Sequence, residues 1–135
     1  MRYLLDTNAV SDLIRNPQGK VAARIAEVGE TSICTSIMVA AELRYGAAKR
    51  NSPRLSAQLE SIFAGLEILS FEVPAEIAYA RLRNDLEAAG KPIGGNDMLI
   101  AAHVVSLGHT IVTDNEREFS RIPGLALENW LRRDH

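Results

Sequence analysis

The sequence has a single cysteine and no long apolar run, and both absences narrow what the protein can be. Cys34 has no second cysteine to pair with, so an intramolecular disulfide is excluded and we expect a reducing compartment. No stretch approaches the apolar length of a transmembrane helix, and too few apolar residues precede Asp6 to form a signal-peptide core. We therefore expect a soluble cytoplasmic protein that has no membrane partner.

Neither sign of charge dominates the sequence. Lys and Arg total 15 against 17 Asp and Glu, which gives a formal net charge of -2. This balance provides no overall attraction for a polyanion, so any contact with nucleic acid needs a local basic patch. One candidate patch lies just beyond Glu42 and could bind RNA phosphates, although cations on an exposed helix commonly serve solubility. It consists of Arg44, Lys49, Arg50 and Arg54.

The pattern of apolar residues predicts short strands that alternate with helices. With 135 residues and 47% hydrophobic content, the chain fits a single domain spanning residues 1–135. Apolar spacing and turn residues predict strands at 3–5, 31–35, 67–71, 110–113 and 125–127, and helices at 9–14, 21–28, 37–50, 54–63, 74–89, 97–107 and 117–120. We expect an α/β fold whose mainly parallel central sheet is flanked by helices on both faces.

Four acidic residues stand where this fold would bring them together. Asp6 and Asp114 directly follow predicted strands. Asp97 lies in the first turn of a helix that Asn96 is expected to cap, and Glu42 lies in the second turn of a helix. In a parallel sheet the strand ends that precede helices share one edge, where ligands bind. The four carboxylates can therefore converge.

Carboxylates gathered at one edge repel each other and need a cation. A neighbouring like charge raises the pKa of a carboxyl group, and a bound cation lowers it. The three histidines share no close ligand spacing, and Cys34 stands in a predicted buried strand. Oxygen ligands alone favour Mg²⁺ or Mn²⁺, since zinc prefers nitrogen and sulfur. Such an ion can activate water for attack on a phosphodiester.

The residues around these acids form a set that resembles the PIN-domain ribonucleases of the VapC toxin type. The resemblance runs from about Arg2 to Trp130, so it covers nearly the whole chain. The segments that carry it are Leu5-Asp6-Thr7-Asn8, Ala41-Glu42-Leu43 with Gly46-Ala47, Ile93-Gly94-Gly95-Asn96-Asp97 with Ile100-Ala101-Ala102, Val112-Thr113-Asp114-Asn115 with Arg117-Glu118-Phe119, Pro123-Gly124-Leu125, and Glu128-Asn129-Trp130.

This resemblance implies a catalytic role for all four acids. Asp6 and Asp97 would be the principal magnesium ligands, and Glu42 a ligand or water-mediated partner. Asp114 would be the fourth acid, with Glu116 as a nearby competitor. Small polar side chains would orient the carboxylates or water. They are Thr7, Asn8, Ser36, Asn96, Thr113 and Asn115.

The resemblance also implies partners that composition and spacing do not reveal. Similar proteins are homodimeric toxins, each inhibited by a VapB-like antitoxin whose C-terminal segment covers the active site. Their substrate is RNA, often a transfer RNA, and they meet DNA only through the antitoxin. The implied activity is therefore a magnesium-dependent endoribonuclease, with Mn²⁺ as a possible substitute.

Two other functions fit some of these features. A noncatalytic PIN-like binding module would share the fold, but it would have little reason to keep four mutually repelling acids. A receiver-like phosphoryl-accepting domain also clusters acids on a parallel sheet. It should have adjacent acids after its first strand, whereas Thr7 and Asn8 follow Asp6 here. Magnesium-dependent cleavage of RNA is the hypothesis that gives all four acids a role.

Overall fold

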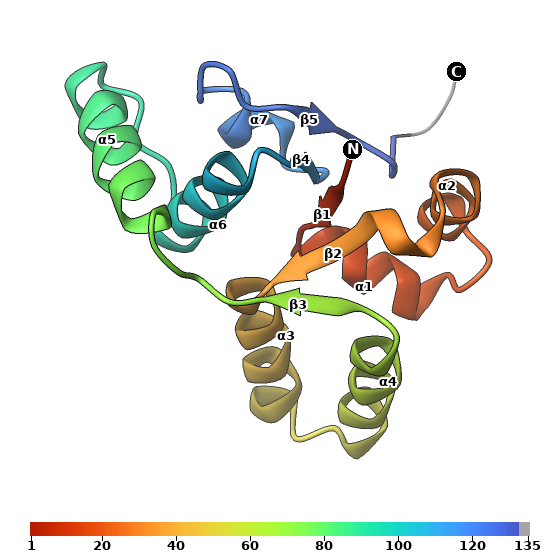
Figure 1. Ribbon diagram of the computed structural model, residues 1–135. Helices are drawn as coiled ribbons and strands as arrows, with labels where there is room; N and C mark the ends of the chain where they lie inside the picture. The colour runs from red at the N-terminus through yellow and green to blue at the C-terminus, as the bar shows by residue number, and fades with distance from the viewer. Residues whose placement is uncertain (133–135) are drawn as a thin grey trace.

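Five short parallel strands form the centre of the protein. The computed structural model describes residues 1–132, and all four neighbouring strand pairs in it are parallel. Figure 1 shows helices on both sides of this sheet, which confirms the predicted α/β class. The strands lie in the order β3-β2-β1-β4-β5. They are β1 (Tyr3–Leu5), β2 (Ile33–Ser36), β3 (Glu67–Leu69), β4 (Thr110–Val112) and β5 (Leu127–Glu128).

Helices connect the strands and cover both faces of the sheet. Two helices in succession, α3 and α4, form a hairpin that leaves the sheet between β2 and β3, while α5 and α6 pack together elsewhere (Figure 1). Within residues 1–132, no helix is both long and apolar enough to cross a membrane. The helices are α1 (Thr7–Arg15), α2 (Lys20–Val28), α3 (Ile37–Arg50), α4 (Pro53–Ala64), α5 (Ala75–Ala88), α6 (Gly95–Leu107) and α7 (Glu116–Phe119).

Some predicted boundaries were wrong by a few residues. The second strand begins at Ile33 and not at residue 31, because Glu30–Ser32 forms a turn of 3-10 helix. Asn96 does not cap α6, since the helix already begins at Gly95 and its N-cap is Gly94. Ser36 is the N-cap of α3, because its hydroxyl accepts a hydrogen bond from the Met38 amide.

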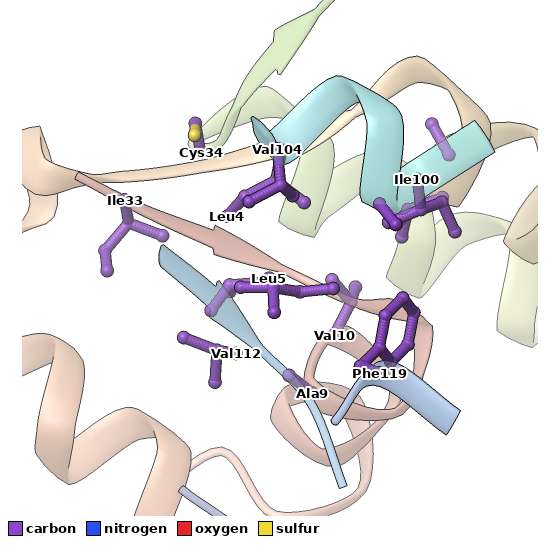
Figure 2. Close-up of a cluster of buried hydrophobic side chains, with 14 of the residues drawn as sticks. Leu4, Leu5, Ala9, Val10, Ile33, Cys34, Ile100, Val104, Val112 and Phe119 are labelled. Carbon is purple, nitrogen blue, oxygen red and sulfur yellow. The ribbon is translucent and has the colours of Figure 1, made fainter. Parts of the chain in front are cut away.

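The central strand β1 is buried on both faces, and this fixes its position. Leu4 and Leu5 are completely buried and point to opposite faces of the sheet, as the alternation of side chains along a strand requires. Figure 2 shows Leu4 on the side of Val104 from α6, and Leu5 on the side of Val10 from α1. Burying each such side chain contributes roughly 1.5–3 kcal/mol. The core therefore anchors the strand that ends at Asp6.

The strand order places a binding crevice beside the end of β1. From β1 the chain continues to β2 on one side, whereas β4 pairs with β1 on the other side. At such a reversal the connecting helices diverge and leave room at the carboxyl ends of the strands. The Asp6 amide donates to the Val112 carbonyl at 2.9 Å, so the ends of β1 and β4 lie side by side. This is where the predicted acids meet.

Candidate active site

Three of the four predicted acids line one open pocket at the carboxyl ends of β1 and β4. Asp6 follows β1, Glu42 comes from α3 and Asp97 from the first turn of α6. The pocket has a volume of about 360 Å³. Its remaining walls are polar or basic and consist of Thr7, Asn8, Ser11, Arg15 and Asn115. Segments that are far apart in the sequence therefore deliver their carboxylates to one place.

Asp6 is the most deeply buried of these acids. Only 3% of it is exposed, and the Thr113 hydroxyl donates to its Oδ2 at 2.7 Å. Its Oδ1 is buried without any hydrogen-bond partner among residues 1–132. Burial raises the pKa of Asp6, and the hydrogen bond from Thr113 opposes that rise. A buried oxygen without a partner is costly in a folded protein, so this atom is suited to binding a cation.

Two polar side chains hold Glu42 in place. The Thr7 hydroxyl donates to Oε2 of Glu42 at 2.7 Å. The Asn96 amide donates to Oε1 of the same carboxylate. Asn96 reaches Glu42 because it lies inside α6, which is also why it is not the cap of that helix. Both oxygens of Glu42 are therefore oriented, each by a residue from a different element.

Asp97 shares its surroundings with an acid that the sequence analysis did not select. The Asn115 amide donates at 3.2 Å both to Oδ2 of Asp97 and to Oε2 of Glu118. Burial raises the pKa of Asp97 to about 7, and the nearby Glu118, Asp6 and Glu42 add to that rise. A hydrogen bond from Asp97 lowers the pKa of Glu118. Asp97 therefore takes up a proton at a higher pH than an ordinary aspartate does, and it donates that proton to Glu118.

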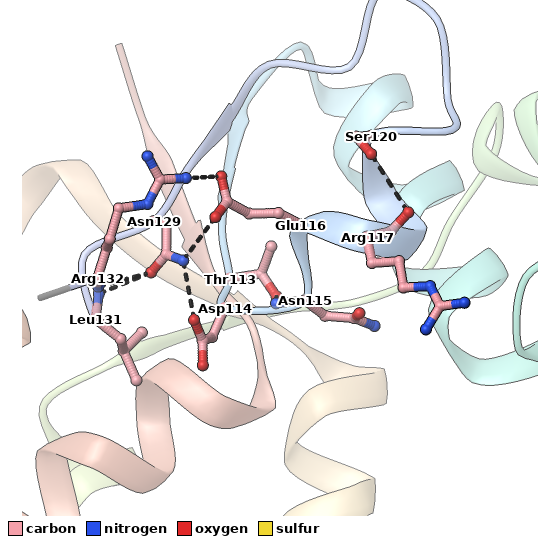
Figure 3. Close-up of polar contacts among 9 residues, drawn as sticks. All are labelled: Thr113, Asp114, Asn115, Glu116, Arg117, Ser120, Asn129, Leu131 and Arg132. Carbon is pink, nitrogen blue, oxygen red and sulfur yellow. Dashed lines mark hydrogen bonds and ion pairs between the residues drawn. The ribbon is translucent and has the colours of Figure 1, made fainter.

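Asp114 does not reach the pocket, although the sequence suggested it as the fourth acid. Its Oδ1 accepts a hydrogen bond from the Asn129 amide at 2.9 Å, and its side chain extends away from that of Asn115 (Figure 3). Glu116, the competing candidate, instead pairs with Arg132 and also accepts from Asn129. Of the acids that follow β4, Glu118 is the one whose carboxylate lies beside Asp97.

One sequence signal could have identified Glu118. It stands in the motif Arg117-Glu118-Phe119, within the short helix α7. Phe119 is completely buried and anchors this helix, so the position before it is held close to the strand end. Glu118 belongs to a motif that carries the family resemblance, but Asp114, which directly follows the predicted strand, is the more obvious fourth acid in the sequence.

The small polar residues around the acids have different contacts. Thr113 contacts Asp6 directly, and Asn8 contacts Thr113 at 3.2 Å and the Asp114 amide at 2.9 Å. Ser36, in contrast, is completely buried, and its hydroxyl lies 2.8 Å from Nδ1 of His103. The structure therefore places Ser36 away from the carboxylates, because its side chain caps α3 and contacts α6.

The predicted basic patch divides into residues with different surroundings. Arg44 forms an ion pair with Glu60, and its guanidinium lies 4.9 Å from the centre of the Phe63 ring. Arg50 lines a cleft that also includes Arg15, next to the acidic pocket. Lys49 and Arg54 are exposed on the surface. The structure therefore brings only Arg50 of the four to the neighbourhood of the acids.

The donor atoms of the pocket fit a hard divalent cation. Within residues 1–132, no three acidic, histidine or cysteine side chains lie close enough to surround a metal ion as they stand. The pocket nevertheless offers carboxylate and amide oxygens, including the unpartnered Oδ1 of Asp6. Oxygen ligands of this kind suit ions such as Mg²⁺ or Mn²⁺ and are a poor set for zinc.

The fold and this acidic pocket are those of a known class of nuclease. Residues 3–125 match the PIN domain, and the chain belongs to the PIN-domain family, whose nucleases depend on divalent metals. The chain is 38% identical over 132 residues to Ribonuclease VapC2 of Rickettsia felis, covering 96% of this chain and 98% of that protein. Within the PIN-domain family it is thus a VapC-type ribonuclease.

Further relatives and solved structures agree with this placement. The tRNA(fMet)-specific endonuclease VapC of Salmonella typhimurium is 36% identical over 131 residues, covering 96% of this chain and 98% of that protein. The crystal structure of DNA-bound VapBC from Salmonella typhimurium matches with a TM-score of 0.89, over 96% of this chain and 98% of that chain. VapBC2 from Rickettsia felis, bound to a DNA fragment from its promoter, matches with a TM-score of 0.87 over 96% of this chain and 99% of that chain.

Proposed function

We propose that this protein is a magnesium-dependent endoribonuclease that cleaves a transfer RNA and acts as the toxin of a toxin–antitoxin pair. The observation that carries the proposal is the acidic pocket, in which Asp6 presents a buried oxygen without a partner beside Glu42 and Asp97. The relative from Salmonella typhimurium is named for its action on tRNA(fMet), which supports a transfer RNA as the substrate. Mn²⁺ has the same ligand preferences and should substitute for Mg²⁺.

The carboxylates of Asp6, Asp97 and Glu42 would hold the cation, and Glu118 would support Asp97. When bound, the cation supplies a Lewis acid that activates water and offsets the charge that develops on the phosphodiester. Thr113 keeps one oxygen of Asp6 turned inward, and Thr7 and Asn96 fix Glu42. These contacts orient the carboxylates, which would still have to close around a cation, because within residues 1–132 no three such side chains surround one as they stand.

The proposed antitoxin would occupy the cleft beside the pocket. This cleft has a volume of about 250 Å³ and lies between α1, α3 and α4, with Ile14, Leu55 and Leu59 among its walls. It also includes Glu42, which lines the acidic pocket as well. A partner segment with apolar side chains could bind here and block access to the acids. The solved structures of similar proteins are VapBC complexes, which supports a VapB-like antitoxin as that partner. Any contact with DNA would then be made by the antitoxin.

We also propose that the protein is a homodimer. Large apolar side chains are exposed on several helices, including Tyr45 on α3 (67% exposed), Ile77 on α5 (58%) and Val105 on α6 (40%). Exposed apolar residues of this kind are typical of protein interfaces when they form a patch. A second copy of the chain packed against one of these helices would remove its exposed apolar side chains from water.

A cleavage assay tests the proposed function. Protein freed of any antitoxin should cut end-labelled transfer RNA in Mg²⁺ and stop when chelator is added. The Asp97→Asn variant should be slower by about 100-fold or more, because it removes a charged cation ligand. Asp85→Asn is the matched control, since Asp85 lies exposed on α5. Cleavage by Asp97→Asn at the rate of the unmodified protein would contradict the mechanism.

The same variants test the toxin role in bacteria. Expression of the unmodified protein, or of Asp85→Asn, should arrest growth, whereas Asp97→Asn at equal abundance should be harmless. Growth arrest by all three proteins would show that toxicity does not come from catalysis at this pocket.

A further inference from the structure

A second cleft opens next to the acidic pocket, and no step of the proposed mechanism uses it. We call it the α1–α2 cleft, because it lies between the end of α1, the loop 16–19 and the start of α2. Its volume is about 730 Å³, which is twice that of the acidic pocket and ample for a nucleotide. Its polar walls are formed by Asp12, Arg15, Asn16, Gln18, Lys20 and Asp114.

Arg15 connects this cleft to the acidic pocket. Its side chain lines both cavities, so a chain molecule that passes from one to the other must pass Arg15. Arg15 is exposed, and within residues 1–132 it takes part in no ion pair. No carboxylate offsets the charge of this exposed guanidinium, so it is available to bind an anionic ligand. Beside three carboxylates that repel phosphates, such a charge favours binding of the RNA backbone at this point.

The walls of the α1–α2 cleft are suited to a nucleobase. Asp114 points toward this cleft and not toward the acidic pocket. Carboxylates accept hydrogen bonds from the amino groups of bases, whereas they repel phosphates. The amide side chains of Asn16 and Gln18 can both donate and accept. The cleft therefore combines a cation at its inner end with acceptors along its walls.

The other cavity that includes Arg15 is less suitable for RNA. It is smaller, about 250 Å³, and its walls are largely aliphatic, with Leu43, Leu55 and Leu59. Stacking platforms for bases are usually aromatic or guanidinium planes. Its composition instead suits the side chains of a protein segment, as proposed above. The α1–α2 cleft is thus the more polar and more spacious route away from the acids.

We propose that the α1–α2 cleft binds the nucleotide adjacent to the scissile phosphate, with Arg15 on a backbone phosphate and Asp114 on an amino group of the base. The inference rests on the proposed ribonuclease function and adds a binding subsite to it. It gives Asp114 a role in substrate selection in place of a role in metal binding.

Substitution of Arg15 tests the phosphate contact. Binding of a fluorescein-labelled single-stranded RNA, measured by anisotropy with Ca²⁺ in place of Mg²⁺, should weaken about tenfold in Arg15→Gln, and the slope of log K against log salt should fall by about 0.7. Arg81→Gln removes the same charge from the exposed face of α5 and is the control. In Mg²⁺, Arg15→Gln should raise KM more than it lowers kcat.

The two variants separate this inference from the proposed function. Binding is measured without turnover, so it does not depend on whether the protein cleaves RNA. If Arg15→Gln and Arg81→Gln bind with equal affinity and equal salt dependence, Arg15 does not contact the backbone and the inference is overturned. If the unmodified protein binds RNA through Arg15 but does not cleave it in Mg²⁺, the proposed function fails and the binding site remains.

Substitution of the base tests the contact with Asp114. Oligonucleotides that carry guanosine or inosine, or adenosine or purine riboside, on either side of the cut differ only in one amino group. At one of these positions the unmodified protein should prefer the amino-bearing base by about tenfold in kcat/KM, and Asp114→Ala, which leaves no acceptor at this position, should reduce that preference. Equal cleavage of all analogues, or a preference that Asp114→Ala leaves unchanged, would overturn the base contact.

Discussion

Asp114 and Glu118 both come after β4 in the sequence, but their carboxylates have different neighbours. Asp114 directly follows the strand predicted at 110–113, so the sequence alone places it at the edge of the sheet. Asn129, which comes from a segment 15 residues later, holds its carboxylate on the other side. Glu118 is further along the chain but is brought back by α7 to share the Asn115 amide with Asp97. Contacts between distant segments set these directions, so spacing could not predict them.

At the residue scale, we predict that Glu118 matters more for metal binding than Asp114. At about pH 8, where Asp97 is ionised, Glu118→Gln should weaken Mg²⁺ binding about tenfold, since it removes a negative charge beside a cation ligand. Asp114→Asn should leave Mg²⁺ affinity close to that of the unmodified protein, because Asn129 and not the pocket holds its carboxylate. Isothermal titration calorimetry measures both affinities. A larger loss in Asp114→Asn than in Glu118→Gln would reverse this ranking.

At the scale of elements, the apolar pattern predicted more than the cap residues did. Each predicted strand and helix overlaps an observed one, because burial of alternating or helically spaced apolar side chains dominates the energy of these segments. The last strand overlaps least, since it was predicted at 125–127 and lies at Leu127–Glu128. The start of α6 was predicted two residues too late. Asn96 is a good capping residue in general, but here its amide contacts Glu42, and two glycines begin the helix. The contact of Asn96 with Glu42 has therefore taken the place of the helix-capping role that asparagine commonly has.

The start of α3 gives a prediction about stability. Ser36 caps α3 and also forms a hydrogen bond with His103, which is 1% exposed. Ser36→Ala should lower the free energy of unfolding by about 2 kcal/mol, because it removes the cap and leaves a buried ring nitrogen without its partner. Ser52→Ala removes only a cap, that of α4, and should cost about 1 kcal/mol.

Urea denaturation of the two variants measures this difference. Because Ser36 contacts none of the carboxylates in the pocket, Mg²⁺ affinity should be unchanged in folded Ser36→Ala protein. Equal destabilisation by Ser36→Ala and Ser52→Ala would mean that the bond to His103 contributes nothing beyond the cap.

At the scale of the whole molecule, the metal site should make stability depend on pH. The pKa of Asp97 is raised from 3.8 to about 7 in the folded protein. Between these values the folded state holds a proton that the unfolded chain has released, so a rise in pH lowers the free energy of unfolding of the metal-free protein. Burial raises the pKa of Asp6 as well, which acts in the same direction. Above about pH 7 Asp97 is ionised in both the folded and the unfolded chain, so it lowers the free energy of unfolding no further.

Mg²⁺ should offset this loss, because it binds the ionised carboxylates. Its stabilisation of the fold should therefore be small at about pH 5 and larger at about pH 8. Thermal unfolding with and without Mg²⁺ at the two pH values measures the difference, and Asp97→Asn should largely remove the pH dependence. Equal stabilisation by Mg²⁺ at both pH values would contradict the raised pKa of Asp97.

The alternation of strands and helices also allowed the class of the whole fold to be predicted. It did not reveal which strands are neighbours, because the order depends on contacts between residues far apart in the sequence. The convergence of Asp6, Glu42 and Asp97 followed from the general geometry of parallel sheets. The shapes of the clefts on either side of the acids depend on how α1, α2, α3 and α4 pack together. The spacing of apolar residues within one helix does not specify that packing.

The central position of β1 has a consequence for synthesis of the protein. Asp6 leaves the ribosome early, but the hydroxyl that orients it belongs to Thr113, 107 residues later, and the strand that supports it, β4, also emerges late. An incomplete chain can form β1 and β2 but cannot close the acidic pocket. We therefore expect a nascent chain of this fold to spare the RNA of the ribosome that makes it until nearly all of the domain has emerged.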